Sequence, residues 1–163
     1  MRTIDFIKTV RYYMAADSEL QSIMSLSAQQ LLDRIYYQSA GFSNTIDAGK
    51  STYKYPCISI LPDNDGSFPL GVPTNTVKLY IIIYNSVKSD NTIEVLLNIS
   101  DRLRLLFRDK HEAINSKSRS LTPPVNLKVR DSQWVSGVNY QDKTLGSEQL
   151  HKYINTLQLI IGD

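Results

Sequence analysis

The chain has 163 residues, of which 42% are hydrophobic and 21% are charged, and its formal net charge is +2. This length suits one domain with a real hydrophobic core, residues 1–163, and the composition excludes wholesale disorder. The net charge is too small to demand a nucleic-acid partner and too small to exclude one.

The N-terminal part is predicted to be helical. Apolar residues recur at helical spacing from Ile4 to Met14, and Ser18–Leu26 continues that helix or forms a second one. Arg34–Tyr37 could begin a strand, whereas Gln38–Ser51 is rich in Ser, Gly and Asn and is typical of an exposed loop.

Two strands are predicted next. Tyr53–Leu61 has a strand pattern, with a proline that marks the strand start or an edge position, and Asp63–Gly66 is a turn that opens a long loop. Val77–Tyr84 is almost continuously apolar, which is typical of a strand covered on both faces. We expect Tyr55–Leu61 to pair antiparallel with Val77–Tyr84.

The second of these strands leads into the element around which the rest should pack. Asn85–Asn91 is a polar turn, and Asp90, Asn91 or Thr92 should cap a helix that begins near Ile93. Spacings of three and four residues place one apolar stripe on this helix. The stripe comprises Leu96, Ile99, Leu103 and Leu106. Residues 77–108 therefore form a central strand–turn–helix unit.

The C-terminal half is predicted to contain three further strands. Lys110–Pro124 is polar and is interpreted as a mobile connection, with partial helix at its start. Val125–Arg130 alternates like a half-exposed strand, and Gln133–Asp142 follows as another. Leu150–Ile161 favours a strand, with a short helix as the alternative. The predicted class is α+β, a mostly antiparallel sheet with helices packed on one face.

The sequence contains none of the common catalytic or nucleotide-binding motifs. The two histidines, His111 and His151, are far apart in sequence and are expected at the surface, and the lone Cys57 is expected to be buried. Leu61–Gly66 is faintly similar to the start of a calcium-binding loop with Gly66 at its sixth position, but the first and twelfth positions would be Leu61 and Val72, whose side chains cannot coordinate a cation. We therefore expect no catalytic site, no cofactor and no metal.

The chain also lacks an apolar run of ~20 residues and a continuous apolar signal core near its start, so no membrane span and a cytoplasmic origin are expected. A single cysteine, which permits no disulfide within the chain, fits that interpretation.

One basic set stands out on and after the central helix. Its cations either form a solvated face that suits the negative end of the helix dipole, or contact DNA phosphates or an acidic partner. No aromatic residues are interleaved to stack on bases. The set comprises Arg102, Arg104, Arg108, Lys110, Lys117 and Arg119.

The order of these elements resembles that of the tail terminator, or tail completion, proteins of long-tailed bacteriophages. The resemblance covers most of the chain, although the segments Lys110–Ser132 and Asp63–Asn75 are longer than that family needs. The matching features are Asp33–Tyr36 after an N-terminal helix, the proline-containing strand Tyr55–Ile60, the strand Val77–Tyr84 leading into the helix Ile93–Phe107, the segment Trp134–Tyr140, and the final segment Tyr153–Ile161.

The resemblance implies a structural protein of the virion, without catalysis. Such a protein forms a ring, commonly a hexamer, that caps the tail tube, ends its polymerisation and offers a surface for head joining. The implied partners are further copies of the chain, the tail tube protein and a head–tail connector or neck protein, with DNA passing through the lumen. Alternatives are another head–tail connector or neck protein, or a small nucleic-acid-binding module that uses the basic set.

Candidate subunit contacts follow from apolar residues in polar surroundings. Phe68, Leu70 and Val72 either are exposed for a partner or fold back over the sheet. Further candidates are Tyr36, Tyr37 and Phe42.

Overall fold

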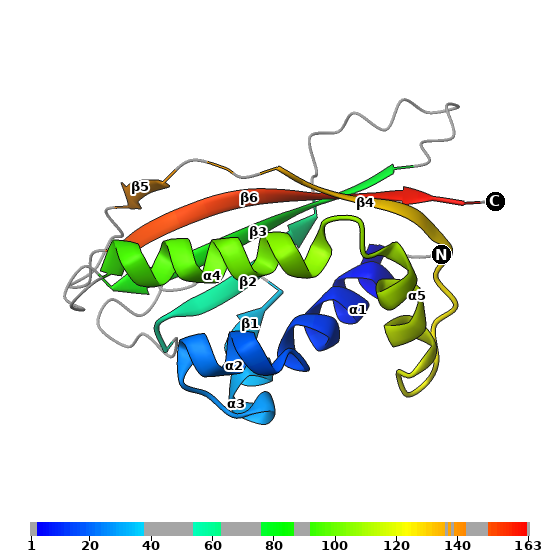
Figure 1. The fold of residues 1–163 in the computed structure, drawn as a ribbon, viewed down its shortest axis with the longest axis horizontal. Coiled ribbons are helices and arrows are strands. Elements are labelled where there is room, and N and C mark those ends of the chain that lie inside the picture. Colours follow the sequence, from blue (N-terminus) through cyan, green and yellow to red (C-terminus); the bar gives the residue numbers. More distant parts are fainter. Residues whose placement is uncertain are drawn as a thin grey trace, which may run out of the picture.

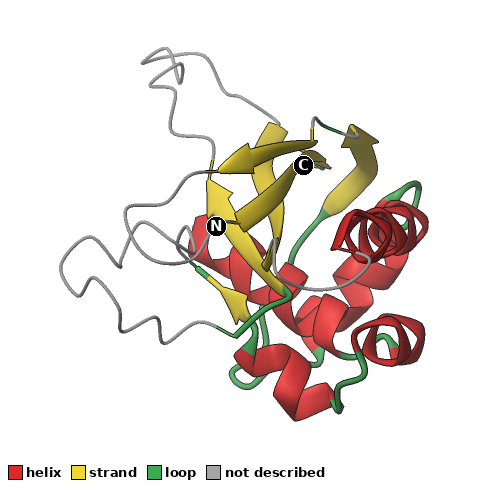
Figure 2. Ribbon diagram, turned by 90° about the vertical axis from the view of Figure 1, so that its left-hand side faces the viewer, coloured by secondary structure: helices red, strands yellow, loops and turns green. Residues whose placement is uncertain are grey.

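The computed structural model describes residues 3–37, 54–62, 76–86, 92–135, 137, 139–142 and 150–162. They form a mostly antiparallel sheet whose one face carries the helices, as Figure 1 and the turned view in Figure 2 show. The predicted α+β class is therefore confirmed. The helices are α1 (Thr3–Ala15), α2 (Ser18–Met24), α3 (Ala28–Asp33), α4 (Thr92–Phe107) and α5 (His111–Arg119), and the strands are β1 (Ile35–Tyr36), β2 (Cys57–Pro62), β3 (Thr76–Ser86), β4 (Val129–Val135), β5 (Asn139–Asp142) and β6 (Leu150–Ile161).

The six-stranded sheet has the order β1-β2-β3-β6-β4, and β5 pairs with β6. The short β1 runs parallel to β2, and the remaining pairs are antiparallel. The predicted pairing of the two middle strands is confirmed, since Ile58 lies opposite Ile83 and Ile60 opposite Ile81. The final segment is a strand and not a helix, because β6 pairs with β3 along its length.

The central unit is confirmed as the middle of the core. Ile81 and Ile83 on β3 are fully buried, as are Leu96, Ile99 and Leu103 on the facing side of α4. Each such side chain contributes roughly 1.5–3 kcal/mol of transfer free energy. The predicted caps Asp90 and Asn91 lie outside the described residues.

Aromatic and polar contacts fix the position of α4 on the sheet. The Phe107 ring stacks on Trp134 with 5.8 Å between centroids, and Tyr13 meets Phe107 edge-on at 5.4 Å. Ser100 Oγ donates a hydrogen bond of 3.1 Å to Oδ1 of the buried Asn155 on β6. A buried pair of polar groups that satisfy each other favours one position of the helix over slipped alternatives.

Capping chemistry separates three helices in the N-terminal part of the chain, the third of which follows the predicted helical region. Asp17 accepts a hydrogen bond from the Leu20 N–H at the start of α2, and α2 ends at Ser25, which has a φ of 54°. Ser27 and Gln30 then form a reciprocal capping box that starts α3. These short polar residues end one helix and begin the next because they satisfy backbone groups that a continuous helix would use.

The partial helix predicted at the start of Lys110–Pro124 is confirmed and is longer than expected, since α5 occupies His111–Arg119, and the interpretation of those residues as a mobile connection is wrong. This helix is polar on most of its surface and buries only Ile114 and Ser118. Two buried positions four residues apart are too few to stand out as an apolar stripe in the sequence.

The predicted strand Val125–Arg130 is also wrong at its start, because β4 begins at Val129. Ser118 of α5 binds the backbone before β4, and Asn115 binds the first residue of the strand. Ser118 Oγ accepts a hydrogen bond from the Leu127 N–H at 3.2 Å, and the side-chain amide of Asn115 bonds both the N–H and the C=O of Val129. Val125 and Leu127 are therefore bonded to α5, whereas the Lys128 carbonyl already accepts a hydrogen bond of 2.6 Å from the Gly162 N–H after β6.

The second predicted strand of this region, Gln133–Asp142, is interrupted. Its first residues belong to β4, its last form β5, and Gly137 lies between them. A Cβ atom at Gly137 would overlap the main-chain carbonyl of Ile154 on β6. Only glycine allows this close approach of two backbones, so the break in the edge of the sheet occurs here.

Candidate functional site

Most of the apolar residues proposed for subunit contacts lie outside the described residues: Phe42, Phe68, Leu70 and Val72. Tyr36 is described and is half-buried, packing on the face of the sheet opposite the helices, beside Cys57 and Tyr84. Tyr37 is 38% exposed, and its ring lies 4.9 Å below the guanidinium of Arg11. Tyr37 is thus the described candidate with the most accessible side chain.

The basic set does not form one free surface. Arg102 binds Asp17 in bidentate fashion, through Nε to Oδ2 at 2.8 Å and Nη2 to Oδ1 at 2.7 Å. Its Nη1 also pairs with Glu19 at 2.6 Å. Arg102 therefore joins α4 to the start of α2, and its charge is neutralised within the chain.

This ion pair also sets the acidity of Asp17. The hydrogen bonds from Arg102, aided by the Leu20 N–H, lower the pKa of the Asp17 carboxyl against the opposing effect of its burial. Nearby, burial raises the pKa of the Tyr13 hydroxyl, which donates a hydrogen bond of 3.0 Å to the Leu106 carbonyl. The lowered pKa favours the charged form of Asp17, and the raised pKa favours the neutral form of Tyr13. Each form is the one that makes the hydrogen bonds seen in the fold.

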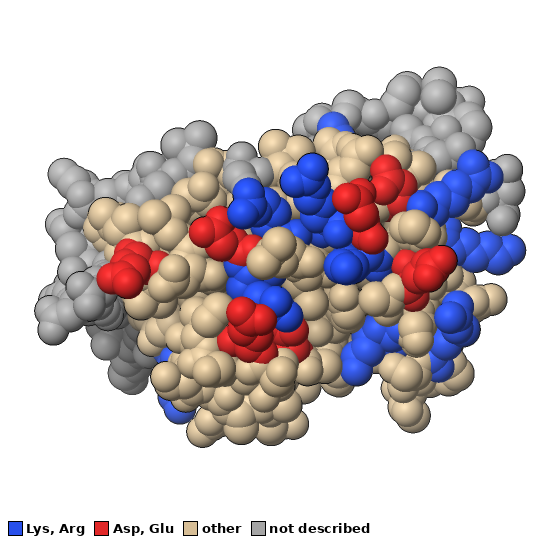
Figure 3. Space-filling view, in the orientation of Figure 1, with Lys and Arg blue, Asp and Glu red and all other residues tan. Residues whose placement is uncertain are grey.

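The other cations are spread over α4, α5 and the turn between them. Arg104 lies 3.6 Å from Asp101, and Arg108 lies 3.8 Å from Asp109. Lys110 is exposed before α5, Arg119 is exposed at its end, and Lys117 is half-buried. Figure 3 shows the same alternation of basic and acidic side chains over the helical face. A surface on which positive and negative charges alternate attracts a phosphate backbone only weakly.

The structure instead reveals an exposed apolar row on the outer side of α4. Ile93 is 47% exposed, Leu97 is 42% exposed and Leu105 is 59% exposed. Spacings of four and eight residues place them along one side of the helix, over about 18 Å at 1.5 Å per residue. We call these three residues the outer row of α4.

The sequence analysis named only the inner stripe of α4 and missed the outer row. The available signal was the excess of apolar residues over what one face of a helix requires. The outer side is mixed, because Glu94, Asp101 and Arg104 share it with these three apolar residues.

Chemically reactive groups are not gathered at any described position. Cys57 is buried as predicted, and burial raises the pKa of its thiol, so the nucleophilic thiolate is disfavoured. His111 and His151 are both half-exposed. Within the described residues, no three His, Cys, Asp or Glu side chains are placed to hold a metal ion. The loop Asp63–Gly66 lies outside the described residues.

A search against models of known protein families gives no match for this chain, and a search against curated proteins gives none either. Among the helices of the described residues, none combines the length and apolarity that crossing a membrane requires.

Proposed function

We propose that the protein is a structural assembly subunit whose copies contact one another through the outer row of α4. Following the resemblance in sequence, its assembled form is the ring that caps a bacteriophage tail tube, ends tube polymerisation and presents the head-joining surface. The resemblance carries the identity of the assembly, and the outer row of α4 is the observation that supports self-association. No catalysis is part of this proposal.

The outer row has the properties of a subunit contact. Three aliphatic side chains at 42–59% exposure still present much of their surface to water. Covering each would contribute roughly 1 kcal/mol. A contact of this kind between different surfaces of identical subunits closes into a ring when the rotation between neighbours permits.

Native mass measurement tests the proposal, with the chain alone and with tail tube protein added. We expect a ring-sized species in at least one of the two samples. Replacing both leucines of the outer row, by Leu97→Asp and Leu105→Asp, should leave the fold intact and reduce the mass to that of the monomer. A matched control is Val135→Asp, because Val135 is 52% exposed on β4 and lies outside the row.

A wild-type chain that stays monomeric at high concentration and does not bind tube ends would contradict the proposal. Ring formation that survives both aspartates would retain the assembly role but remove α4 from the contact. Microscopy of the virion separates a tail cap from another neck or connector protein by its position. The nucleic-acid alternative predicts DNA affinity that falls steeply with salt, which the internally paired Arg102 does not favour.

A further inference from the structure

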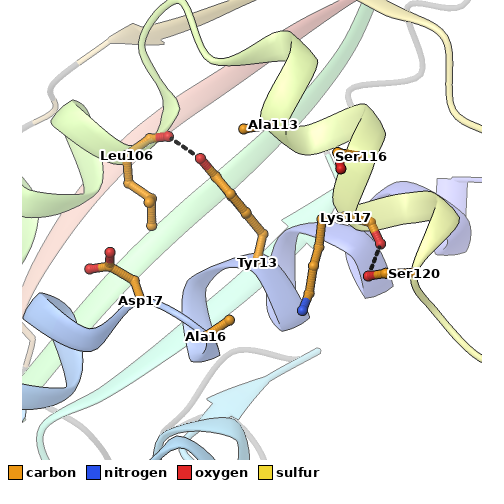
Figure 4. A pocket seen from close by; sticks show the side chains of 8 residues that line it. All are labelled: Tyr13, Ala16, Asp17, Leu106, Ala113, Ser116, Lys117 and Ser120. Carbon is orange, nitrogen blue, oxygen red and sulfur yellow. Dashed lines mark hydrogen bonds between the residues drawn. The ribbon is translucent and has the colours of Figure 1, made fainter.

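A groove opens between α1 and the segment that follows α5. It holds about 800 Å³, within the range of ligand clefts, and is walled by the exposed side of α1, the end of α5 and residues 121–126. A second hollow of about 460 Å³ lies between α1, the end of α4 and α5, as Figure 4 shows. Lys117 and Ser120 line both hollows. The two are therefore neighbours, and we call them together the α1–α5 groove.

The outer wall of the groove is held in place by Ser118, which is fully buried. Its carbonyl accepts a hydrogen bond from the Val125 N–H at 2.9 Å, and its hydroxyl accepts one from the Leu127 N–H at 3.2 Å. The Leu121 N–H also donates to the Ser118 carbonyl, at 3.3 Å. Because both ends of residues 121–127 are bonded to α5, the wall has a defined shape before any ligand arrives. A preformed wall reduces the entropy lost on binding.

The groove carries an excess of positive charge. Lys8, Arg11 and Lys117 line its larger part, where Asp5 is the one carboxylate among the described lining residues. None of the three cations forms an ion pair with a carboxylate of the described residues, in contrast to Arg102. In Figure 4 the Lys117 side chain extends from α5 towards α1.

Arg11 is the most firmly positioned of these cations. Its Nη2 donates a hydrogen bond of 2.8 Å to the Leu32 carbonyl, and its guanidinium stacks over Tyr37 at 4.9 Å. Its Nε is buried and has no hydrogen-bond partner in the described part of the chain. A guanidinium held by a neutral carbonyl and an aromatic ring keeps its full positive charge available to an incoming anion.

The remaining lining favours a polypeptide ligand. Tyr12 and Tyr37 are 40% and 38% exposed, and Pro123 and Pro124 stand on the opposite wall. Tyrosine presents a rigid apolar ring with a polar tip, a combination enriched where proteins bind other polypeptides. Extended peptides bind in grooves of this kind, with flat side chains along the walls.

We propose that the α1–α5 groove binds an extended acidic segment of a partner protein, whose carboxylates meet Lys8, Arg11 and Lys117. A nucleic-acid duplex is a convex rod, so its phosphates would reach the exposed Lys8 but not the half-buried Arg11 and Lys117 inside a concave groove. This surface is separate from the outer row of α4, and the proposal does not depend on self-association.

Fluorescence anisotropy with a labelled glutamate-rich peptide tests the proposal. We expect saturable binding that weakens with salt, and no binding of the same peptide with glutamine at each glutamate. Arg11→Gln and Lys117→Gln should each weaken binding about fivefold or more. Arg11→Gln also removes the bond to Leu32, so its thermal melt is recorded. The Lys117 side chain forms no hydrogen bond or ion pair with the described residues, so Lys117→Gln provides a second test if the Arg11 variant does not fold.

Lys78→Gln is the matched control, because Lys78 is exposed on β3, outside the groove, and its loss should leave the affinity unchanged. Absence of binding at ~1 mM peptide, equal affinity for the glutamine peptide, or an equal loss in the Lys78 variant would each overturn the proposal. So would tighter binding of a single-stranded oligonucleotide that depends on the same cations. Each readout is independent of the mass measurement that tests ring formation.

Discussion

Both sides of α4 carry large aliphatic residues, yet the structure uses them differently. Leu103 on the inner side is fully buried against the sheet, whereas Leu105, two positions along the chain, is 59% exposed. The same residue type in the same helix thus stabilises the fold in one direction and faces solvent in the other. Apolar content alone does not tell which side of a helix forms the core and which is left for a partner.

The largest expected effect lies on the inner side. Leu103→Ala should lower the free energy of unfolding by about 2–5 kcal/mol, because it removes buried methyl groups and leaves a cavity between α4 and the sheet. Leu105→Ala, the matched change on the outer side, should alter it by no more than about 0.5 kcal/mol. Urea denaturation of both variants measures the difference. Equal losses of unfolding free energy in the two variants would show that the inner and outer sides of α4 do not differ in their contribution to stability.

The next effect concerns the polar edge of α4, where Arg102 meets Asp17. Asp17→Ala should destabilise by about 2–4 kcal/mol, since it removes the N-cap of α2 and leaves a partly buried guanidinium with Glu19 alone. Asp17→Asn keeps an oxygen that can cap the helix and should cost less. An asparagine variant as unstable as the alanine variant would assign the whole effect to the ion pair.

The same carboxyl makes stability depend on acidity. The pKa of Asp17 in the folded chain lies below its ordinary value of 3.8, so its contribution is present above about pH 4 and is lost as the pH falls through the lowered value. Unfolding free energies of the wild type and Asp17→Asn should therefore converge below pH 4. Curves that stay parallel through this range would contradict the lowered pKa.

A smaller effect is expected where α5 meets the edge of the sheet. Asn115→Ala should cost about 1–3 kcal/mol, because the N–H and C=O of Val129 lose both side-chain partners at a buried residue. Asn98→Ala on the exposed part of α4 is the matched control and should be near neutral. Urea denaturation of the two alanine variants tests whether Asn115 bonds Val129 in place of a neighbouring strand. Equal losses of unfolding free energy in the two variants would argue that it does not.

The smallest effect is expected at Arg104, two residues from Arg102. Its pair with Asp101 is exposed and 3.6 Å long, so Arg104→Ala should change stability by about 0.5 kcal/mol or less. Thermal melts at low and high salt measure it. A loss as large as that of Asp17→Ala would mean that burial of the ion pair does not decide its strength.

Parts of the fold were predictable because their signals are local. The continuous apolar run of β3 and the three- and four-residue spacing of Leu96, Ile99 and Leu103 identify a covered strand and a one-sided helix. The candidate surfaces were less accessible to sequence reasoning. Arg102 carries the same charge as Arg104, and only the fold shows that one is paired with Asp17 inside the chain.

The sequence by itself determined the α+β class, the pairing of β2 with β3 and the buried stripe of α4, because hydrophobic periodicity and chain proximity specify these features. Only the tertiary structure decided that the helix after Lys110 extends to Arg119, that β4 starts at Val129, and that the edge of the sheet breaks at Gly137. The latter two depend on contacts outside the local pattern: Ser118 of α5 binds the backbone of Val125 and Leu127 before β4, and the β6 carbonyl leaves no room for a Cβ atom.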